Sequence, residues 1–266
     1  MQEGLQKGYL MIDTHIHLDS EQYDSDLEDV INSALKDGVE QFIIPGADPK
    51  DLTKAIKIAE LHENIFFSVG AHPYHWEEYD EALFEQYINH PKCVAVGECG
   101  LDYYRLPESQ EEIEREKVGQ KEVFVAQIEL AKRYNKPLIV HIRDASNDSK
   151  ELLLEHNSGE VGGVLHCFNA DEQLLSLTNL NFYFGIGGVL TFKNAKKLVN
   201  ILPKIPQEKL VIETDGPYLT PHPFRGTRNE PKYTLLVAER ISEILNIEYK
   251  DVINLTDANA KRLFLI

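Results

Sequence analysis

The stretch "YLMIDTHIHLDSEQYDSDLEDVINSALKDG", residues 9–38, places a short apolar run before an amphipathic segment. The apolar run is typical of a strand that is buried on both faces. Residues 24–38 show helical periodicity with a charged face. A strand followed by a helix is half of a βαβ unit, in which the crossover lays a helix over a parallel sheet. The stretch therefore predicts the first unit of an α/β fold.

The same alternation recurs along the whole chain. Seven later apolar runs end near Gly46, Gly70, Glu98, His141, His166, Gly187 and Asp215. Eight strand–helix units in about 250 residues predict a (β/α)8 TIM barrel. A doubly wound open sheet is the structural alternative, but no Gly-x-Gly-x-x-Gly opens a helix after the first strand.

The chain reads as a single domain over residues 1–266, without an internal linker, repeat or low-complexity tract. The first ten residues, "MQEGLQKGYL", lack the long apolar core of a secretory signal, and we interpret them as a short N-terminal arm. No apolar run reaches the roughly 18–20 residues that a membrane helix requires, so we expect no membrane association.

The composition restricts the class of partner and the compartment. The net charge is −17, from 44 acidic and 27 basic residues, which argues against broad, non-specific binding to a nucleic-acid backbone. Phosphate substrates remain possible if bound metal ions supply the positive charge. Three cysteines without a Cys-x-x-Cys pair indicate a reducing cytosol, so we expect a cytoplasmic protein. No feature indicates an obligate protein partner.

Imidazoles and carboxylates follow several of the expected strands. The six residues are His15, His17, Glu98, His141, His166 and Asp215. In a barrel the carboxyl ends of all strands meet at one rim, and residues two apart on a strand point to the same side. A lone histidine at a strand end is more often structural than a ligand, and His-x-His alone is a weak signal. The coincidence of all six at one rim is what indicates a metal site.

The size of the set indicates how many ions it would hold. Burying these groups without a cation would leave several of them underpaired, at about 1–3 kcal/mol each. One catalytic zinc takes three protein ligands and a water, so six candidates suit two ions with a bridging carboxylate. Glu98, from the middle strand of the set, is the expected bridge. Zinc, manganese and magnesium remain open as the two divalent ions.

Seven motifs, in order from residue 12 to residue 231, resemble those of a known family. They are "IDTHIHLD", "GAHPYH", "GECGLDYYR", "PLIVHIRDA", "GGVLHCF", "IETDGPYLTP" and "PFRGTRNEP". Together they resemble the motif series of TatD-type metal-dependent deoxyribonucleases, within the amidohydrolase superfamily. The resemblance implies a (β/α)8 barrel with a two-metal site that hydrolyses phosphodiester bonds in DNA.

The resemblance also implies a role for each residue of the set. His15 and His17 would hold one ion together with Asp215. Glu98 would bridge the ions, and His141 and His166 would hold the second ion.

Three further residues are implied to contact the substrate. His72 would line the pocket, and Arg225 would approach a substrate phosphate. Arg143 is either a phosphate contact or a member of a structural ion pair. After "HCF" the family more usually has Ser-Gly, whereas this chain has Asn169 and Ala170, so the substrate contacts of that loop are not carried over.

The expected reaction is attack on phosphorus by a hydroxide held between the two ions. Asp215 is the expected general base, Glu98 the second catalytic residue, and Arg225 would stabilise charge on the phosphoryl oxygens. An acidic protein can take DNA if it grips only a few phosphates, so we expect exonuclease-like action on single strands or strand ends. Tyr103 and Tyr104 would either stack on a terminal base or pack within their loop.

Three other functions compete with this interpretation. An amidohydrolase-type esterase or deacylase, for example on aminoacyl-tRNA ester bonds, would use the same bridged hydroxide. Many amidohydrolases have a carboxylated lysine where this chain has Glu98, which favours phosphodiester hydrolysis. A phosphoesterase of another metal-barrel family would need a further early histidine and a late Asp-x-His, which are missing. A non-catalytic metal-binding protein is the third alternative.

Overall fold

The computed structural model describes residues 10–266, so residues 1–9 of the expected N-terminal arm lie outside the described part. The strands are β1 (Met11–Asp13), β2 (Val39–Ile44), β3 (Ile65–Val69), β4 (Cys93–Asp102), β5 (Leu138–Arg143), β6 (Gly163–Leu165), β7 (Phe182–Ile186) and β8 (Leu210–Ile212). The α-helices are α1 (Leu27–Lys36), α2 (Leu52–Leu61), α3 (Glu81–Tyr87), α4 (Gln110–Tyr134), α5 (Ser146–Glu155), α6 (Lys196–Ile201), α7 (Thr234–Leu245) and α8 (Tyr249–Phe264).

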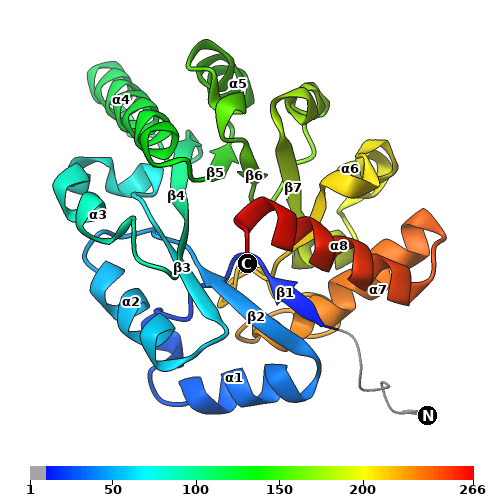
Figure 1. Ribbon diagram of the computed structural model, residues 1–266. Helices are drawn as coiled ribbons and strands as arrows, with labels where there is room; N and C mark the ends of the chain where they lie inside the picture. The colour runs from blue at the N-terminus through cyan, green and yellow to red at the C-terminus, as the bar shows by residue number, and fades with distance from the viewer. Residues whose placement is uncertain (1–9) are drawn as a thin grey trace.

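All eight strands run parallel in one sheet whose order follows the chain from β1 to β8. Figure 1 shows them as a ring with the helices around its outside. The ring closes where the N–H of Thr14 donates to the carbonyl of Ile212 at 3.1 Å and Ile16 bridges Gly216. The predicted (β/α)8 barrel is confirmed, and the doubly wound alternative is wrong because neither its reversed strand order nor its open edges are present.

The sequence pattern explains how each unit docks. In α1, Val30, Ile31 and Ala34 are buried on one face, while Glu28 and Asp29 stay exposed in the first turn, where negative charge favours a helix N-terminus. The segment between β6 and β7 is a 3-10 helix, Glu172–Leu180, so one of the crossovers lacks an α-helix.

No helix in residues 10–266 combines the length and apolar character that crossing a membrane requires.

The interior of the barrel is apolar at the end where the strands begin. A buried cluster takes side chains from most strands, namely Ile12, Ile43, Val94, Ile139, Val164, Tyr183 and Val211. Leu263 and Phe264 from the end of α8 complete this cluster, and Figure 1 shows the end of α8 over the centre of the ring. Because α8 covers this end, the other end of the barrel is the one that is left for a site.

A buried carboxyl joins the first strand to the last. Asp13 accepts hydrogen bonds from the Thr214 hydroxyl at 2.6 Å and from the Thr214 N–H at 2.9 Å. It also accepts the N–H of His15 at 3.3 Å. Burial raises the pKa of Asp13 to about 8, against the opposing effect of the Thr214 hydrogen bonds. Asp13 thus ties β1 to the segment after β8 at the point where the barrel closes.

Replacement of Asp13 by alanine is expected to lower the free energy of unfolding by about 1–3 kcal/mol, because the buried donors of Thr214 lose their acceptor. Urea unfolding followed by circular dichroism measures this change. Glu122→Ala, an exposed carboxylate on α4, is the control and should stay within about 0.5 kcal/mol of the parent. Equal destabilisation by the two variants would contradict the role of Asp13.

Candidate metal centre

A cavity of about 1230 Å³ opens at the carboxyl ends of the strands, opposite the end of α8. The predicted site residues that line it are His17, His72, Glu98, His141, Arg143, His166 and Asp215. His15 is fully buried next to the cavity, with its side chain toward Glu98. Arg225 alone among the predicted site residues lies away from both the cavity wall and the cluster.

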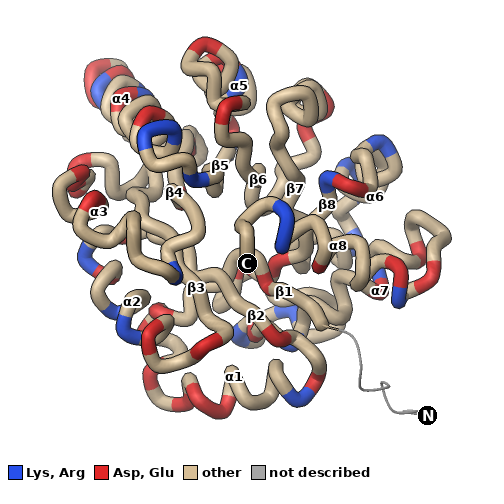
Figure 2. Tube along the Cα trace, viewed as in Figure 1, with Lys and Arg blue, Asp and Glu red and all other residues tan. Residues whose placement is uncertain are grey.

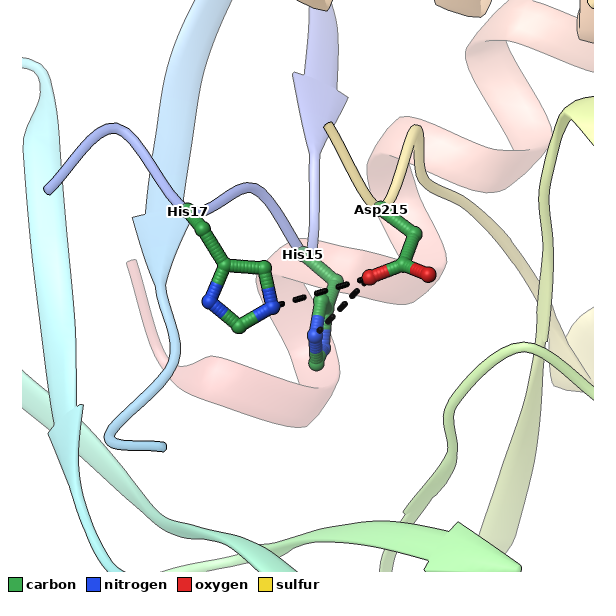
Figure 3. A group of neighbouring side chains, drawn as sticks. All are labelled: His15, His17 and Asp215. Atoms are coloured by element: carbon green, nitrogen blue, oxygen red, sulfur yellow. Dashed lines mark ion pairs between the residues drawn. The ribbon is translucent and has the colours of Figure 1, made fainter. Parts of the chain in front are cut away.

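One group of donors joins the first strand of the barrel to the last. His15 and His17 lie just after β1, and Asp215 lies just after β8. Asp215 Oδ1 lies 3.7 Å from His15 Nε2 and 3.6 Å from His17 Nε2. Figure 3 shows the three side chains pointing toward one another. This group has the membership that was predicted for the first ion.

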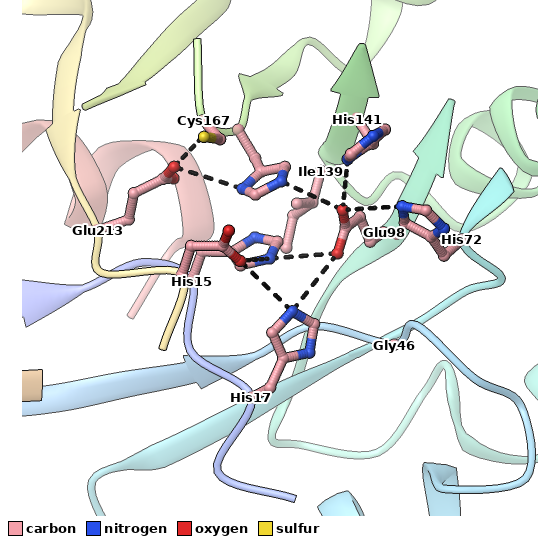
Figure 4. A network of polar contacts seen from close by, with 12 residues as sticks. His15, His17, Gly46, His72, Glu98, Ile139, His141, Cys167 and Glu213 are labelled. Carbon is pink, nitrogen blue, oxygen red and sulfur yellow. Dashed lines mark hydrogen bonds and ion pairs between the residues drawn. The ribbon is translucent and has the colours of Figure 1, made fainter. Parts of the chain in front are cut away.

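Glu98 stands at the centre of the histidines. Its Oε2 lies 3.2 Å from His15 Nε2, and its Oε1 lies 2.8 Å from His141 Nδ1 and 3.2 Å from His166 Nε2. His72 Nε2 is 3.7 Å from the same Oε1. Figure 4 shows the imidazoles converging on this one carboxylate. A carboxylate that turns one oxygen to each set of histidines has the arrangement of a bridging ligand.

The backbone before Glu98 requires a glycine. Gly97 has φ +141°, and a Cβ there would lie 2.3 Å from the carbonyl oxygen of Ile139 on β5. The N–H of Glu98 donates to the carbonyl of Gly46 at 2.8 Å. Close approach of β2, β4 and β5 at this point therefore aims the Glu98 side chain into the barrel.

The charges of the cluster support one another. Burial alone would raise the pKa of Glu98, but the charge of His166 and the hydrogen bond with His141 hold this pKa well below its usual range. Burial would lower the pKa of His166, but Glu98 and Glu213 hold it well above its usual value. Burial and His166 together lower the pKa of His15. Glu98 is therefore an ionised, buried carboxylate among imidazoles.

The donor set fits divalent cations. Both ring nitrogens of His15 are buried and neither makes a well-directed hydrogen bond within residues 10–266, since Nε2 has only its ion-pair contact with Glu98 at 3.2 Å. An unsatisfied buried polar atom costs about 1–3 kcal/mol, and a cation would remove that cost. Imidazole and carboxylate donors are the ligands that zinc and manganese prefer. The groups His15, His17, Asp215 and His15, Glu98, His166 would hold such ions.

His141 is placed differently from its predicted group. Its donor atoms cluster with those of His72 and Asp102, while His166 clusters with His15 and Glu98. The contact of His141 Nδ1 with Glu98 nevertheless keeps it beside the second group. Its role as a ligand of the same ion as His166 stays a prediction.

Two carboxylates outside the predicted set, Asp102 and Glu213, contact the ring nitrogens of His141 and His166 that do not face Glu98. Asp102 Oδ2 lies 3.0 Å from His141 Nε2, and Glu213 Oε1 lies 3.3 Å from His166 Nδ1. Glu213 also accepts the N–H of Cys167 at 2.5 Å. In both pairs the other ring nitrogen faces Glu98. Such carboxylate–histidine pairs fix the tautomer and orientation of a metal-ligating imidazole.

A signal for both carboxylates was present in the sequence. Glu213 precedes Asp215 by two residues, and Asp102 follows Glu98 by four. On a strand, even spacing places side chains on the same face. The rule that paired His15 with His17 would therefore have found Asp102 and Glu213 as well.

The two predicted phosphate-binding arginines lie on aromatic rings. Arg143 lines the cavity, and its guanidinium lies 3.6 Å from the centroid of Tyr104. No carboxylate of residues 10–266 forms an ion pair with Arg143, so the alternative of a structural ion pair does not apply to the described structure. The guanidinium of Arg225 lies 3.9 Å from the centroid of Phe192. Its approach to substrate stays a prediction, because it lies outside the cavity lining.

Known proteins share this fold and its motifs. The family model described as TatD related DNase matches residues 12–265, which is nearly the whole chain. The chain belongs to the TatD DNase family. It is thus a metal-dependent hydrolase, and the buried His–carboxylate cluster is the candidate place for the metal.

Relatives in the TatD family match over almost their full length. A Bacillus subtilis (strain 168) protein named as the metal-dependent hydrolase YabD is 43% identical, over 97% of this chain and all of the relative. An Escherichia fergusonii protein named 3'-5' ssDNA/RNA exonuclease TatD is 34% identical, over 96% of this chain and 98% of the relative. The crystal structure of YjjV, a TatD homolog from Escherichia coli K12, superposes with a TM-score of 0.86 at 28% identity, covering 96% and 98% of the two chains.

Loss of the carboxylates behind the histidines is expected to weaken metal binding. Glu213→Gln and Asp102→Asn should each lower the affinity for Zn²⁺ by about 10–100-fold, because the imidazole loses its charged partner. Isothermal titration calorimetry of the metal-stripped protein measures this affinity. Glu172→Gln, an exposed carboxylate that pairs with Lys204, is the control. An unchanged affinity in both buried variants would contradict the supporting role.

A second variant tests the place of Glu213 without altering its charge. A Cβ at Gly185 would lie 2.2 Å from Glu213 Oε2, so Gly185→Ala should displace this carboxylate and lower Zn²⁺ affinity. At Gly187 the nearest atom is 3.5 Å away, so Gly187→Ala should bind Zn²⁺ as the parent does. Equal affinities in the two alanine variants would show that the position of Glu213 does not govern the metal centre.

Proposed function

We propose that this TatD-family protein is a two-metal nuclease that hydrolyses phosphodiester bonds of DNA at single-stranded ends. The observation that carries the proposal is the buried Glu98 carboxylate, which turns one oxygen to His15 and the other to His141 and His166 beside an open cavity. The description of the family model as a DNase, and the name of the Escherichia fergusonii relative, support a nucleic acid as substrate.

In this proposal His15, His17 and Asp215 would hold one ion, His141 and His166 would hold the other, and Glu98 would serve as a ligand to both. When bound, the two ions supply Lewis-acid stabilisation of phosphoryl oxygens and make water acidic enough to react near neutral pH. Zinc, manganese and magnesium are all compatible with this donor set, because imidazole ligands suit zinc and carboxylate ligands suit manganese and magnesium.

Asp215 is the proposed general base. Burial would raise the pKa of Asp215, but the contact of its Oδ1 with His17 Nε2 at 3.6 Å and the charge of His166 hold this pKa below its usual value. The carboxylate is therefore ionised at neutral pH and able to accept a proton from the attacking water. Its partly exposed position at the cavity wall gives that water access.

His72 is the proposed neutral donor to the substrate. Burial and the neighbouring His141 lower the pKa of His72 to about 3, so its ring is uncharged. Its Nδ1 accepts the N–H of Tyr74 at 3.1 Å, which leaves the ring proton on Nε2. His72 lines the cavity and its Nε2 lies 3.7 Å from Glu98, so the Nε2–H can donate to a phosphoryl oxygen placed beside it.

The proposed compartment is the cytoplasm. Cys93, Cys99 and Cys167 are all free thiols in the structure. Burial raises the pKa of Cys93 to about 11 and of Cys167 to about 12, so these thiols stay protonated and unreactive. An enzyme with three unpaired cysteines suits a reducing environment.

The decisive assay uses a 5′-labelled single-stranded oligodeoxynucleotide with Mn²⁺, Zn²⁺ or Mg²⁺, with and without a chelator. We expect stepwise release of mononucleotides that stops on chelation. Glu98→Ala and the isosteric Glu98→Gln should reduce cleavage to the background rate while far-UV circular dichroism stays unchanged, because the carboxylate that the two donor groups share is removed.

Full cleavage by both Glu98 variants with metal present would contradict the two-metal proposal. Absence of cleavage with every metal, together with turnover of a carboxylic ester or an aminoacyl-tRNA, would instead assign the protein as a deacylase.

A further inference from the structure

Apart from the donor cluster and its supporting carboxylate Asp102, the charged residues that line the cavity are divided by sign between its two sides. The acidic wall comes from the loops after β1 and β2 and consists of Asp19, Glu21, Asp48 and Asp51. The basic wall comes from the loops after β4, β5 and β7 and consists of Arg105, Arg143, Lys196 and Lys197.

The order of the strands places the two walls opposite each other. In a closed ring of eight strands in chain order, β1 and β2 lie across the centre from β5 and β6, and the loops of the basic wall follow β5 and the two strands that flank this pair, β4 and β7. Figure 2 shows the basic residues at the start of α6 on a different side of the ring from the acidic first turn of α1. The donor cluster around Glu98 therefore lies between a negative side and a positive side.

The cations of the basic wall are held without carboxylate partners. Elsewhere on the surface, Arg133 pairs with Glu81 and Glu85, and Lys204 pairs with Glu172. None of the four basic-wall side chains forms an ion pair with a carboxylate of residues 10–266. In a chain with 44 acidic residues, four such cations along one cavity edge leave positive charge for an external anion.

One of these cations is positioned by an aromatic ring. The Arg143 guanidinium stacks on Tyr104 at 3.6 Å, and Tyr104 keeps 56% of its surface exposed. Stacking fixes the plane of a guanidinium while its N–H edge stays available for a phosphate. The exposed part of Tyr104 also offers a surface on which a base can stack. Tyr103 is used differently, because its hydroxyl donates to Asp148.

We propose that the basic wall is the track for the backbone of one nucleic-acid strand and that the acidic wall excludes the complementary strand. This inference rests on the proposed nuclease function and assigns the selection of a single strand over a duplex to the two charged walls of the cavity. A single strand can turn all its phosphates to the basic wall and a base to Tyr104. A duplex carries phosphates on both strands, so some would face the acidic wall without solvent between them.

The first test measures how binding depends on salt. The metal-loaded protein is titrated with a fluorescent 12-nucleotide single strand whose phosphorothioate linkages resist hydrolysis, at several salt concentrations. Lys196→Ala/Lys197→Ala should reduce the slope of log K against log salt by about 0.7 for each phosphate that the variant no longer neutralises. Lys204→Ala, whose side chain pairs with Glu172 outside the cavity, is the control and should keep the parental slope. An unchanged slope in the double variant would overturn the track.

The second test measures selection against duplex. Glu21→Gln/Asp51→Asn removes two exposed charges of the acidic wall and should raise the affinity for a blunt duplex relative to the single strand by about fivefold. Asp29→Asn/Glu122→Gln changes the net charge equally on α1 and α4, away from the cavity, and should leave this ratio as in the parent. Equal ratios in the two double variants would overturn the exclusion by the acidic wall.

Failure of this inference can be told apart from failure of the proposed function. If the parent protein cleaves DNA but the salt slope and the duplex ratio do not respond as expected, only the assignment of the walls is wrong. If the parent protein cleaves no phosphodiester with any metal, including bis(p-nitrophenyl) phosphate, the nuclease function and the inference that rests on it are both wrong.

Discussion

Closure of the sheet between β1 and the segment after β8 is the constraint on which the site depends. The hydrogen bond from Thr14 to Ile212 and the buried bonds between Asp13 and Thr214 hold together segments about 200 residues apart. His15 and Asp215 directly follow the two threonines, and their donor atoms are 3.7 Å apart. The same bonds that complete the barrel therefore bring the candidate metal donors together. The stability of the barrel and the geometry of the candidate site thus depend on the same contact between β1 and the segment after β8.

The buried charge of Glu98 is stabilised by several neighbouring side chains. Glu98 is almost fully buried, yet three imidazoles lie within 3.2 Å of its oxygens and keep it ionised. Asp102 and Glu213 orient two of these imidazoles from behind. Such a cluster is costly for a protein to bury unless cations share the donors, since partly satisfied buried networks are less stable than apolar ones. The arrangement is understandable as a preformed metal centre.

The acidic composition is compatible with a phosphate substrate because acidic and basic residues lie on different sides of the cavity. A net charge of −17 opposes broad contact with a nucleic-acid backbone. At the cavity, however, the loops after β4, β5 and β7 present Arg105, Arg143 and Lys197, while carboxylates gather after β1 and β2. The net charge thus determines how the whole protein surface interacts with a polyanion, whereas the electrostatic potential at the cavity depends on the charged residues of a few loops.

Local patterns in the sequence were sufficient to predict the strand order and the barrel, because strand periodicity and parity depend only on neighbouring residues. The same patterns predicted six donors whose side chains the structure brings together at one end of the barrel, and their role as metal ligands stays a prediction. Asp102 and Glu213 obeyed the same parity and were predictable in principle. The regrouping of His141 with His72 and Asp102, the place of Arg225 on Phe192, and the two facing walls were decided only by the tertiary structure. These features depend on distances between loops that are far apart in the chain, and closure of the barrel sets those distances.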